Sequence, residues 1–357
     1  MEVERKKVGK VFNSMDKTFE GLEPVKESVE IVFPARLNAM ALDPSKVELN
    51  EDNIYTPGEL VFSVKLYTRV KAKIIDEPEV RVGDDCPRKA LLKHSASIMR
   101  QELGLEKGIY VEAYNEHGIK HAGLGSSGGI NAGVVSAINY LYGEPVSKQE
   151  LIKFIAQNHG EEIDGDDDHI IPVQCIGGSA SSGMLNFNTI MLAGESCVVK
   201  TANIEGEYSV IIGLPKDFES PDAEKALKKE AENMEGFVEC GEKHGEEIAY
   251  RVLHDVLPAM EKNELGPVGD LVFDYRFDMG SNDNCAFMYP RLKEITRNIR
   301  FLHEEGYADA LAVSSVGPGV FAITKNPEKC RKVFEEQDLK IVETELEPSS
   351  FRVVEES

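Results

Sequence analysis

The sequence predicts an α+β protein with mixed sheets, organised as two domains. Segments with strand-like alternation open the chain, helical segments dominate its middle, and the second part combines long helices with further strands. The chain has 357 residues, more than one compact core usually organises, which favours two domains of roughly 150–200 residues each. We place the domains at residues 1–200 and 201–357, because the strand-like segment EYSVIIGLP opens the second part.

The first half begins with strands and continues with helices. VEIVFPARLNAM from Val29 and residues 59–75 alternate and are rich in β-branched side chains, so both are predicted strands with a polar loop between them. Apolar residues at helical spacing after Pro87 predict a helix, and GIYVEAYNE predicts the next strand. INAGVVSAINYLYG predicts a buried helix, and the Ser147 to Glu150 spacing is a capping-box pattern that begins another.

The second half mixes long helices with a late pair of strands. AEKALKKEAENMEGF, GEEIAYRVLHDVLPAMEKN and YPRLKEITRNIRFLHEEG are predicted helices. ALAVSSVGPGVFAIT and KIVETEL are predicted strands, with a charged helix between them. This mixture completes the α+β class.

Composition and charge exclude several classes of function. No apolar run approaches the roughly 20 residues that span a bilayer, and the charged start MEVERKKVGK lacks the apolar core of a secretory signal, so we expect a cytoplasmic protein. The net charge of −23 repels DNA and anionic membrane surfaces, so neither nucleic acid nor a membrane is an expected partner. The six cysteines form no CxxC pair, which indicates reduced thiols rather than a zinc site.

A glycine-rich segment carries the strongest functional signal. HAGLGSSGG, residues 121–129, lies between a predicted strand and a predicted helix. Glycines let the backbone turn tightly, and the free amides and dipole of a helix N-terminus favour an anion. A glycine-rich turn without a ligand is the alternative. We predict that a substrate phosphate is bound by Gly123, Leu124, Gly125, Ser126, Ser127, Gly128 and Gly129.

The acidic run EEIDGDDDH, residues 161–169, ends the preceding helix and supplies carboxylates. One carboxylate can accept a hydroxyl proton, and another can hold Mg²⁺, which neutralises charge on a transferred phosphate. A solvated loop is the alternative. Arg36 is suited to pair with a substrate carboxylate or phosphate, or equally to form a surface ion pair. His94 and His121 are interpreted as structural, because nothing in the sequence supplies them with a nucleophile to activate.

Two motifs resemble those of the GHMP kinase superfamily. HAGLGSSGG matches the superfamily's GLGSS-type loop, and SSVGPGVFA, residues 314–322, matches its late glycine-rich strand and turn. The resemblance implies an N-terminal half like ribosomal protein S5 domain 2 and a C-terminal ferredoxin-like half. It also implies ATP as co-substrate, Mg²⁺ as cofactor, a small-molecule substrate and, at the level of the family, a homodimer.

The middle of the chain resembles one branch of this superfamily. Residues 164–172, followed by the paired glycines 177–178, are similar to a stretch of the homoserine kinases. The similarity implies that Asp168 is the catalytic residue near the phosphoryl acceptor. His169 stands where that branch has asparagine, which argues against homoserine itself. The implied magnesium site consists of Ser127, Asp164 and Glu162.

The two ends of the chain resemble another branch, the archaeal β-ribofuranosylaminobenzene 5′-phosphate synthases of methanopterin biosynthesis. PARLN with Asp43, and SSVGPGVFAI, carry this resemblance, although Asn38 and Val316 depart from the usual histidine and tryptophan. In that alternative the loop binds phosphoribosyl diphosphate in place of ATP, and an aminobenzoate is the second substrate.

The sequence therefore predicts a kinase that transfers the γ-phosphate of ATP to a hydroxyl of a small anionic metabolite. The phosphoribosyl diphosphate-using synthase and a non-catalytic nucleotide-binding protein are the alternatives. The predicted substrate contacts are Arg36, Asn38, His169, Ser314, Ser315 and Gly317.

Overall fold

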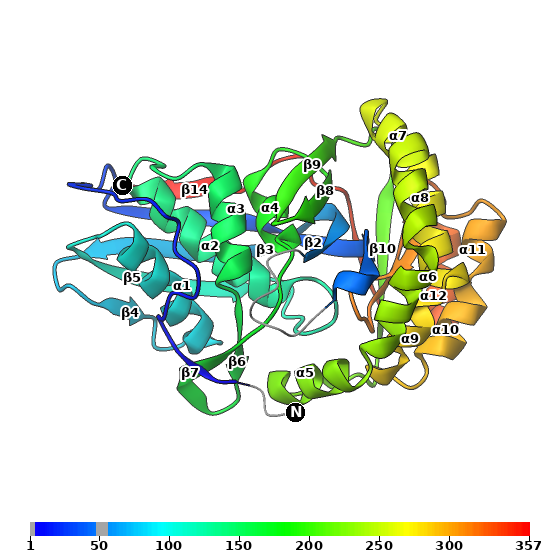
Figure 1. Cartoon of the computed structure of the whole chain (residues 1–357), viewed down its shortest axis with the longest axis horizontal. Coiled ribbons are helices and arrows are strands. Elements are labelled where there is room, and N and C mark those ends of the chain that lie inside the picture. The colour runs from blue at the N-terminus through cyan, green and yellow to red at the C-terminus, as the bar shows by residue number, and fades with distance from the viewer. Residues whose placement is uncertain (1–3, 48–55) are drawn as a thin grey trace.

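The computed structural model describes residues 4–47 and 56–357. It consists of two halves, each built on a sheet covered by helices (Figure 1). The first sheet is mixed, because β4 and β5 run parallel while its other pairs are antiparallel. The predicted α+β class with mixed sheets is confirmed. None of the helices formed by the described residues is both long and apolar enough to cross a membrane.

The first sheet has seven strands in the order β14-β2-β3-β5-β4, with β8 paired to β3 and β9 paired to β8. The 20-residue strand β3 pairs with β2 over most of its length, with β8 at its start and with β5 at its end. The strand bounds are β2 (Ser28–Ala41), β3 (Thr56–Ile75), β4 (Val80–Val82), β5 (Gly108–Asn115), β8 (Thr189–Gly194), β9 (Cys197–Ala202) and β14 (Arg352–Glu356).

Helices cover one face of this sheet. α2 is buried along almost its whole length, as its small and apolar residues predict, and it packs on β2 and β3. The predicted capping box is confirmed, since the Ser147 side chain accepts from Glu150 N and the Glu150 side chain accepts from Ser147 N. The helix bounds are α1 (Lys89–Glu102), α2 (Ser126–Leu141), α3 (Lys148–Gln157) and α4 (Gly178–Met184).

The acidic run forms a β-hairpin, where the sequence indicated only the end of a helix. β6 (Gly160–Ile163) and β7 (Asp166–Pro172) are antiparallel, and β1 (Lys6–Lys7) adds a third strand to β7. Ile163, Ile170 and Ile171 are buried, while Gly165 with φ +79° turns the chain between the strands. The sequence did not predict the hairpin, because its few apolar residues are separated by exposed acidic residues and give only a short alternating pattern.

The second half contains an antiparallel sheet in the order β11-β12-β10-β13. Its strands are β10 (Ser209–Pro215), β11 (Ala310–Val313), β12 (Val320–Thr324) and β13 (Leu339–Thr344). The predicted helix AEKALKKEAENMEGF is interrupted, so that α5 ends before Asn233 and α6 begins at Glu235. The α-helices are α5 (Ala223–Glu232), α6 (Glu235–Arg251), α7 (Leu257–Glu261), α8 (Gly266–Phe273), α9 (Ser281–Asn284), α10 (Leu292–Ile299), α11 (Phe301–Glu304) and α12 (Pro327–Glu336).

Short segments of other helical geometry complete the chain. Two π-helical segments continue α6 and α8, and two 3₁₀ segments follow β2 and α9. They are η1 (Pro44–Lys46), η2 (Val252–Val256), η3 (Asp274–Asp278) and η4 (Cys285–Phe287).

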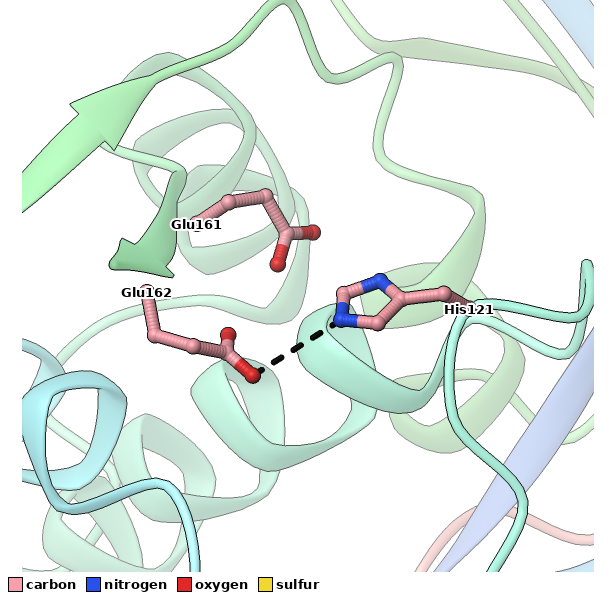
Figure 2. Close-up of side chains that lie close together, drawn as sticks. All are labelled: His121, Glu161 and Glu162. Atoms are coloured by element: carbon pink, nitrogen blue, oxygen red, sulfur yellow. Dashed lines mark ion pairs between the residues drawn. The ribbon is translucent and has the colours of Figure 1, made fainter. Parts of the chain in front are cut away.

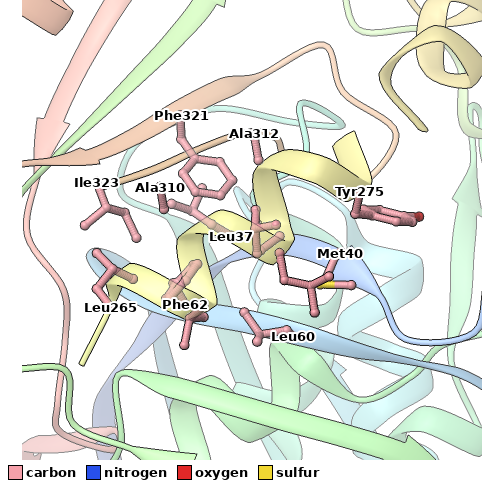
Figure 3. Packing of buried hydrophobic residues seen from close by; sticks show 14 of the residues in the cluster. Leu37, Met40, Leu60, Phe62, Leu265, Tyr275, Ala310, Ala312, Phe321 and Ile323 are labelled. Atoms are coloured by element: carbon pink, nitrogen blue, oxygen red, sulfur yellow. The ribbon is translucent and has the colours of Figure 1, made fainter. Parts of the chain in front are cut away.

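A common hydrophobic core joins the two halves (Figure 3). Leu37 and Phe62 of the first sheet belong to the same buried cluster as Leu265 and Phe321 of the second half. The chain then returns to the first sheet, where β14 pairs with β2. The division at residue 200 stays a prediction, since the last strand lies in the sheet of the first half.

Candidate functional site

A cavity of about 310 Å³ lies between the two halves. Its lining comes from β2, β3, β6, α4 and the segment before α2 in the first half. In the second half, α5, η3 and residues 315–317 close it from the other side. The cavity therefore brings together segments that are far apart in the sequence.

The glycine loop, residues 123–129, forms the start of α2 at the cavity wall. Gly123 and Gly125 have φ angles of +86° and +66°, which glycine adopts without steric cost. Gly129 N donates the first helical hydrogen bond to Gly125 O at 2.8 Å. Within the described part of the chain, no group accepts a hydrogen bond from the backbone N–H of residues 126–128. These amides lie at the positive end of the α2 dipole, an arrangement that binds anions.

The structure divides the predicted loop residues into two groups. Leu124 is 2% exposed and packs in the shared core, and the amide of Gly129 is used by the helix. Neither residue lines the cavity. The loop residues in the cavity wall are Gly123, Gly125, Ser126, Ser127 and Gly128.

Two distant segments contact the carbonyl of Gly123. Arg36 Nη1 donates to Gly123 O at 3.0 Å, and Ser314 Oγ donates to the same oxygen at 2.6 Å. Ser314 Oγ also accepts from Asn38 N at 3.0 Å. A Cβ at position 123 would lie 2.3 Å from Ser314 O, so this contact requires glycine. The structure thus brings Arg36, Asn38 and Ser314 to the loop.

A buried hydrogen-bond network holds Asn38 in the cavity wall. The Asn38 side-chain amide donates to Glu59, whose other oxygen accepts from Gly178 N at 2.6 Å. Arg276, which is 2% exposed, donates to Asn38 O at 3.2 Å and to Ser315 O at 3.0 Å. Burial raises the pKa of Glu59. The Asn38 side-chain amide is therefore bound within the first half, and the contact of Arg276 with Asn38 O links the two halves.

Arg36 presents an unsatisfied donor in the cavity wall. Its Nε is buried, and no acceptor for it exists among residues 4–47 and 56–357. An unpaired buried donor costs free energy unless a ligand or water satisfies it. A carboxylate or phosphate bound in the cavity would supply the charge opposite to that of the Arg36 guanidinium.

Helix α5 forms the wall on the side of the second half. Ala223, Ala226, Leu227 and Glu230 follow helical spacing and all line the cavity. Burial raises the pKa of Glu230 to about 7, and the nearby charge of Glu161 adds to this effect. Glu230 is therefore the single acid on an otherwise apolar helix face.

Acidic residues of β6 lie beside the glycine loop (Figure 2). Potential ligand atoms of His121, Glu161 and Glu162 lie within 4.8 Å of one another. Ser127 Oγ donates to Glu161 Oε2 at 2.7 Å. Glu162 is instead bound by Arg88, with one oxygen accepting from Nε and the other from Nη2 at 2.5 Å. Burial alone would raise the pKa of Glu162, but His121 and the Arg88 guanidinium outweigh it and hold the pKa well below its usual range.

The oxygen atoms of Ser127 and Glu161 could serve as ligands of a divalent cation, and Glu161 takes the role predicted for Glu162. Magnesium prefers oxygen ligands and is commonly bound by one or two carboxylates together with substrate phosphates. The Ser127 hydroxyl and the Glu161 carboxylate both lie in the cavity wall next to the free amides. Glu162 does not line the cavity, because its two oxygens face Arg88.

Three predicted site residues do not meet the glycine loop. Asp164, Asp168 and His169 lie on the exposed part of the β6–β7 hairpin and are not part of the cavity lining. The Asp168 side chain is 76% exposed and lies 3.3 Å from Lys93 Nζ, and His169 Nδ1 lies 3.0 Å from Asp166 Oδ2. The tight hairpin turn directs these side chains to solvent, which the sequence did not reveal. Of the late turn, Ser315 and Gly317 line the cavity while the buried Ser314 lies behind it.

Several polar residues of the site were not predicted. Glu161 neighbours a predicted ligand, so the acidic run contained a usable signal. Glu59 is a charged residue at the start of a strongly apolar strand, which also hints at a role. The other missed residues, for which sequence patterns contain no comparable signal, are Arg88, Glu230 and Arg276.

Comparisons with known proteins agree with this architecture. Residues 90–178 match the family model of the GHMP kinases N terminal domain. No curated protein matches the chain.

Solved structures with the same fold cover nearly the whole chain. A homoserine kinase from Cytophaga hutchinsonii aligns with a TM-score of 0.60 at 15% identity, covering 94% of this chain and 99% of its own. Lactococcus lactis galactokinase, complexed with galactose, aligns with a TM-score of 0.65 at 12% identity over 91% of this chain and 95% of its own. Mevalonate kinase of L. major, in complex with R-mevalonate, gives 0.58 at 12% identity over 92% and 100%. At these identities the likeness establishes the fold.

Proposed function

Because residues 90–178 match the family model of the GHMP kinase N-terminal domain and the whole chain has the fold of that superfamily, we propose that the protein is an ATP-dependent kinase of a small metabolite. The observation that carries this proposal is the set of free amides at the N-terminus of α2, which faces a cavity between the two halves. A cavity there has room for a second substrate beside the bound phosphates. The proposed reaction transfers the γ-phosphate of ATP to a hydroxyl of that substrate.

The glycine loop is the proposed phosphate site. Backbone N–H groups of residues 126–128 and the α2 dipole would hold the phosphates without a change of conformation. Ser127 and Glu161 are the proposed ligands of Mg²⁺. When bound, Mg²⁺ neutralises charge on the transferring phosphate.

The second substrate is proposed to bind between Arg36 and α5. Arg36 lines the cavity, and its guanidinium charge can pair with a carboxylate or phosphate, which makes an anionic metabolite the proposed class of acceptor. Glu230 is the proposed acceptor of the hydroxyl proton, because it lines the cavity and its pKa of about 7 lies close to neutral pH. Asp168, implied by the resemblance for this role, lies outside the cavity lining and serves as the matched comparison.

The first test measures the melting temperature of the purified protein with Mg²⁺–ATP and, separately, with Mg²⁺–phosphoribosyl diphosphate. The proposal expects a rise with ATP that is abolished in Ser127→Ala. ADP release is then followed with a panel of hydroxylated carboxylic acids and sugar phosphates. A rise with phosphoribosyl diphosphate alone would transfer the assignment to the synthase, and pyrophosphate release with an aminobenzoate would then be measured.

A second test separates catalysis from nucleotide binding. In Glu230→Gln we expect turnover to fall about 100-fold or more while the affinity for ATP stays within about threefold, since general base catalysis contributes roughly 10²–10⁴-fold. Asp168→Asn should leave turnover nearly unchanged. The reverse result would reinstate Asp168, and ATP binding without turnover in any panel would favour a non-catalytic nucleotide-binding protein.

A further inference from the structure

Arg88 lies directly beneath the glycine loop. It precedes α1, its φ is +62°, and its side chain is 2% exposed. It does not line the cavity. A buried guanidinium is retained only where its donors are satisfied and its charge is paired. The contacts of Arg88 therefore show which groups of the site depend on it.

The guanidinium connects both loop serines with both carboxylates of β6. Arg88 Nη1 donates to Ser126 Oγ at 3.2 Å, and Nη2 donates to Ser127 Oγ at 2.5 Å. Nη2 also lies 3.3 Å from Glu161 Oε2. Glu162 receives the two-pronged contact from Nε and Nη2, which is the strongest geometry for this pair.

The charges of this cluster balance in one specific way. Glu162 uses both oxygens to neutralise Arg88, whereas the contact of Arg88 with Glu161 is a single, longer one from Nη2. The pair Arg88–Glu162 is then neutral, and the negative charge of Glu161 remains for a cation. Ser127 accepts from Arg88 and donates to Glu161, so its second lone pair remains for a ligand in the cavity.

We propose that Arg88 and Glu162 act as a charge-balanced pair: Arg88 bridges the loop serines and β6, and Glu162 keeps Arg88 from neutralising Glu161, so that the charge of Glu161 remains for a cation. This inference rests on the proposed function, in which Ser127 and Glu161 bind a divalent cation. Neither residue of the pair touches the substrate in this arrangement.

The pair predicts effects of opposite sign on cation affinity. Without the charge of Glu162, the nearest acid to Arg88 is Glu161, and the uncompensated guanidinium repels a divalent cation. Without the charge of Arg88, the charge of Glu162 is no longer neutralised, and the site gains one negative charge. When both charges are removed, the net charge of the original site returns.

The experiment titrates Mn²⁺ into the full-length protein and measures free Mn²⁺ by electron paramagnetic resonance, without nucleotide. In Glu162→Gln we expect Mn²⁺ affinity to fall about tenfold or more, as the Coulomb energy at these separations implies. In Arg88→Gln the affinity should equal or exceed that of the wild type. The double variant should return to within about threefold of the wild type.

Two further variants serve as controls for misfolding and for a general effect of removing a carboxylate. Arg88→Lys keeps the positive charge, and with it the net charge of the site, in case Arg88→Gln does not fold. Lysine cannot reproduce the two-pronged contact, but because the expected effect comes from charge, the Mn²⁺ affinity should stay within about threefold of the wild type. Glu30→Gln removes a carboxylate from the distant Arg69 ion pair on the first sheet and should change nothing at the site.

Loss of affinity in both Glu162→Gln and Arg88→Gln, without recovery in the double variant, would overturn the pairing alone. A wild type that binds no Mn²⁺ would overturn it together with the proposed cation site, and the melting-temperature test with ATP would show whether the nucleotide part survives. Opposite effects with recovery would establish the pair.

Discussion

His94 is the side chain for which we develop one prediction in depth. It lies on α1, is 1% exposed, and forms hydrogen bonds through both ring nitrogens. Nδ1 accepts from Gly9 N at 3.1 Å, which makes Nε2 the donor to Asn158 O at 2.9 Å. This neutral tautomer ties the N-terminal segment to the end of α3. A protonated ring could no longer accept from Gly9.

Burial lowers the pKa of His94 from the ordinary 6.5 to about 4 in the folded protein. The unfolded chain therefore binds this proton more readily than the folded one. The stabilising contribution is complete above pH 6.5 and is lost progressively as the pH falls from 6.5 towards 4. The full loss is about 3 kcal/mol, and about 2 kcal/mol of it falls between pH 7 and pH 5.

The assay is urea unfolding at pH 7 and pH 5 for the wild type and His94→Gln. The variant is less stable at pH 7 because it loses native contacts, but its loss of stability on acidification should be about 2 kcal/mol smaller than that of the wild type. Other titrating groups act on both proteins alike and cancel in this difference. Equal losses in His94→Gln and the wild type would refute the reasoning.

Three further substitutions test the loop, a helix start and the shared core. Gly125→Ala forces a left-handed φ on alanine and places its Cβ 2.4 Å from Ser179 Oγ. We therefore expect the unfolding free energy to fall by about 1–2 kcal/mol and ATP binding to weaken. Gly118→Ala has a similar φ but open space around its Cβ, and it should leave ATP binding unchanged. Ser147→Ala removes a capping box and should cost about 1 kcal/mol by urea unfolding, and an unchanged midpoint would contradict the assigned cap. Phe321→Ala should lower the unfolding free energy by about 3–5 kcal/mol, because Phe321 is fully buried. Calorimetry should still show a single unfolding transition, because this residue belongs to the core common to both halves. Two separated transitions would contradict a shared core.

Local patterns in the sequence were sufficient for most elements and for the glycine loop. The alternation in β2 and β3 and the apolar surface of α2 show which faces are buried, because buried positions carry apolar residues. The proposed phosphate site likewise consists of residues that lie close together in the sequence. Its glycines and helix start lie within residues 123–129, so no distant contact is needed to recognise it.

The assignment of the carboxylates needed three-dimensional information. Glu161 and Glu162 are adjacent, yet one lines the cavity and the other pairs with Arg88, because successive residues of a strand point in different directions. Asp168 belongs to the same acidic run, but the hairpin turn places it in solvent. A one-residue difference in position along this strand decides which acid can meet a ligand.

By itself, then, the sequence determined the α+β class, the succession of helices and strands over most of the chain, and the glycine-rich turn at the start of α2, because each depends on residues close together in the chain. Only the tertiary structure decided that Arg36, Ser314 and Arg276 converge on one cavity and that Arg88 lies beneath its loop. Such contacts depend on how two sheets pack through a common core. That packing is a property of many distant side chains together, and no short segment encodes it.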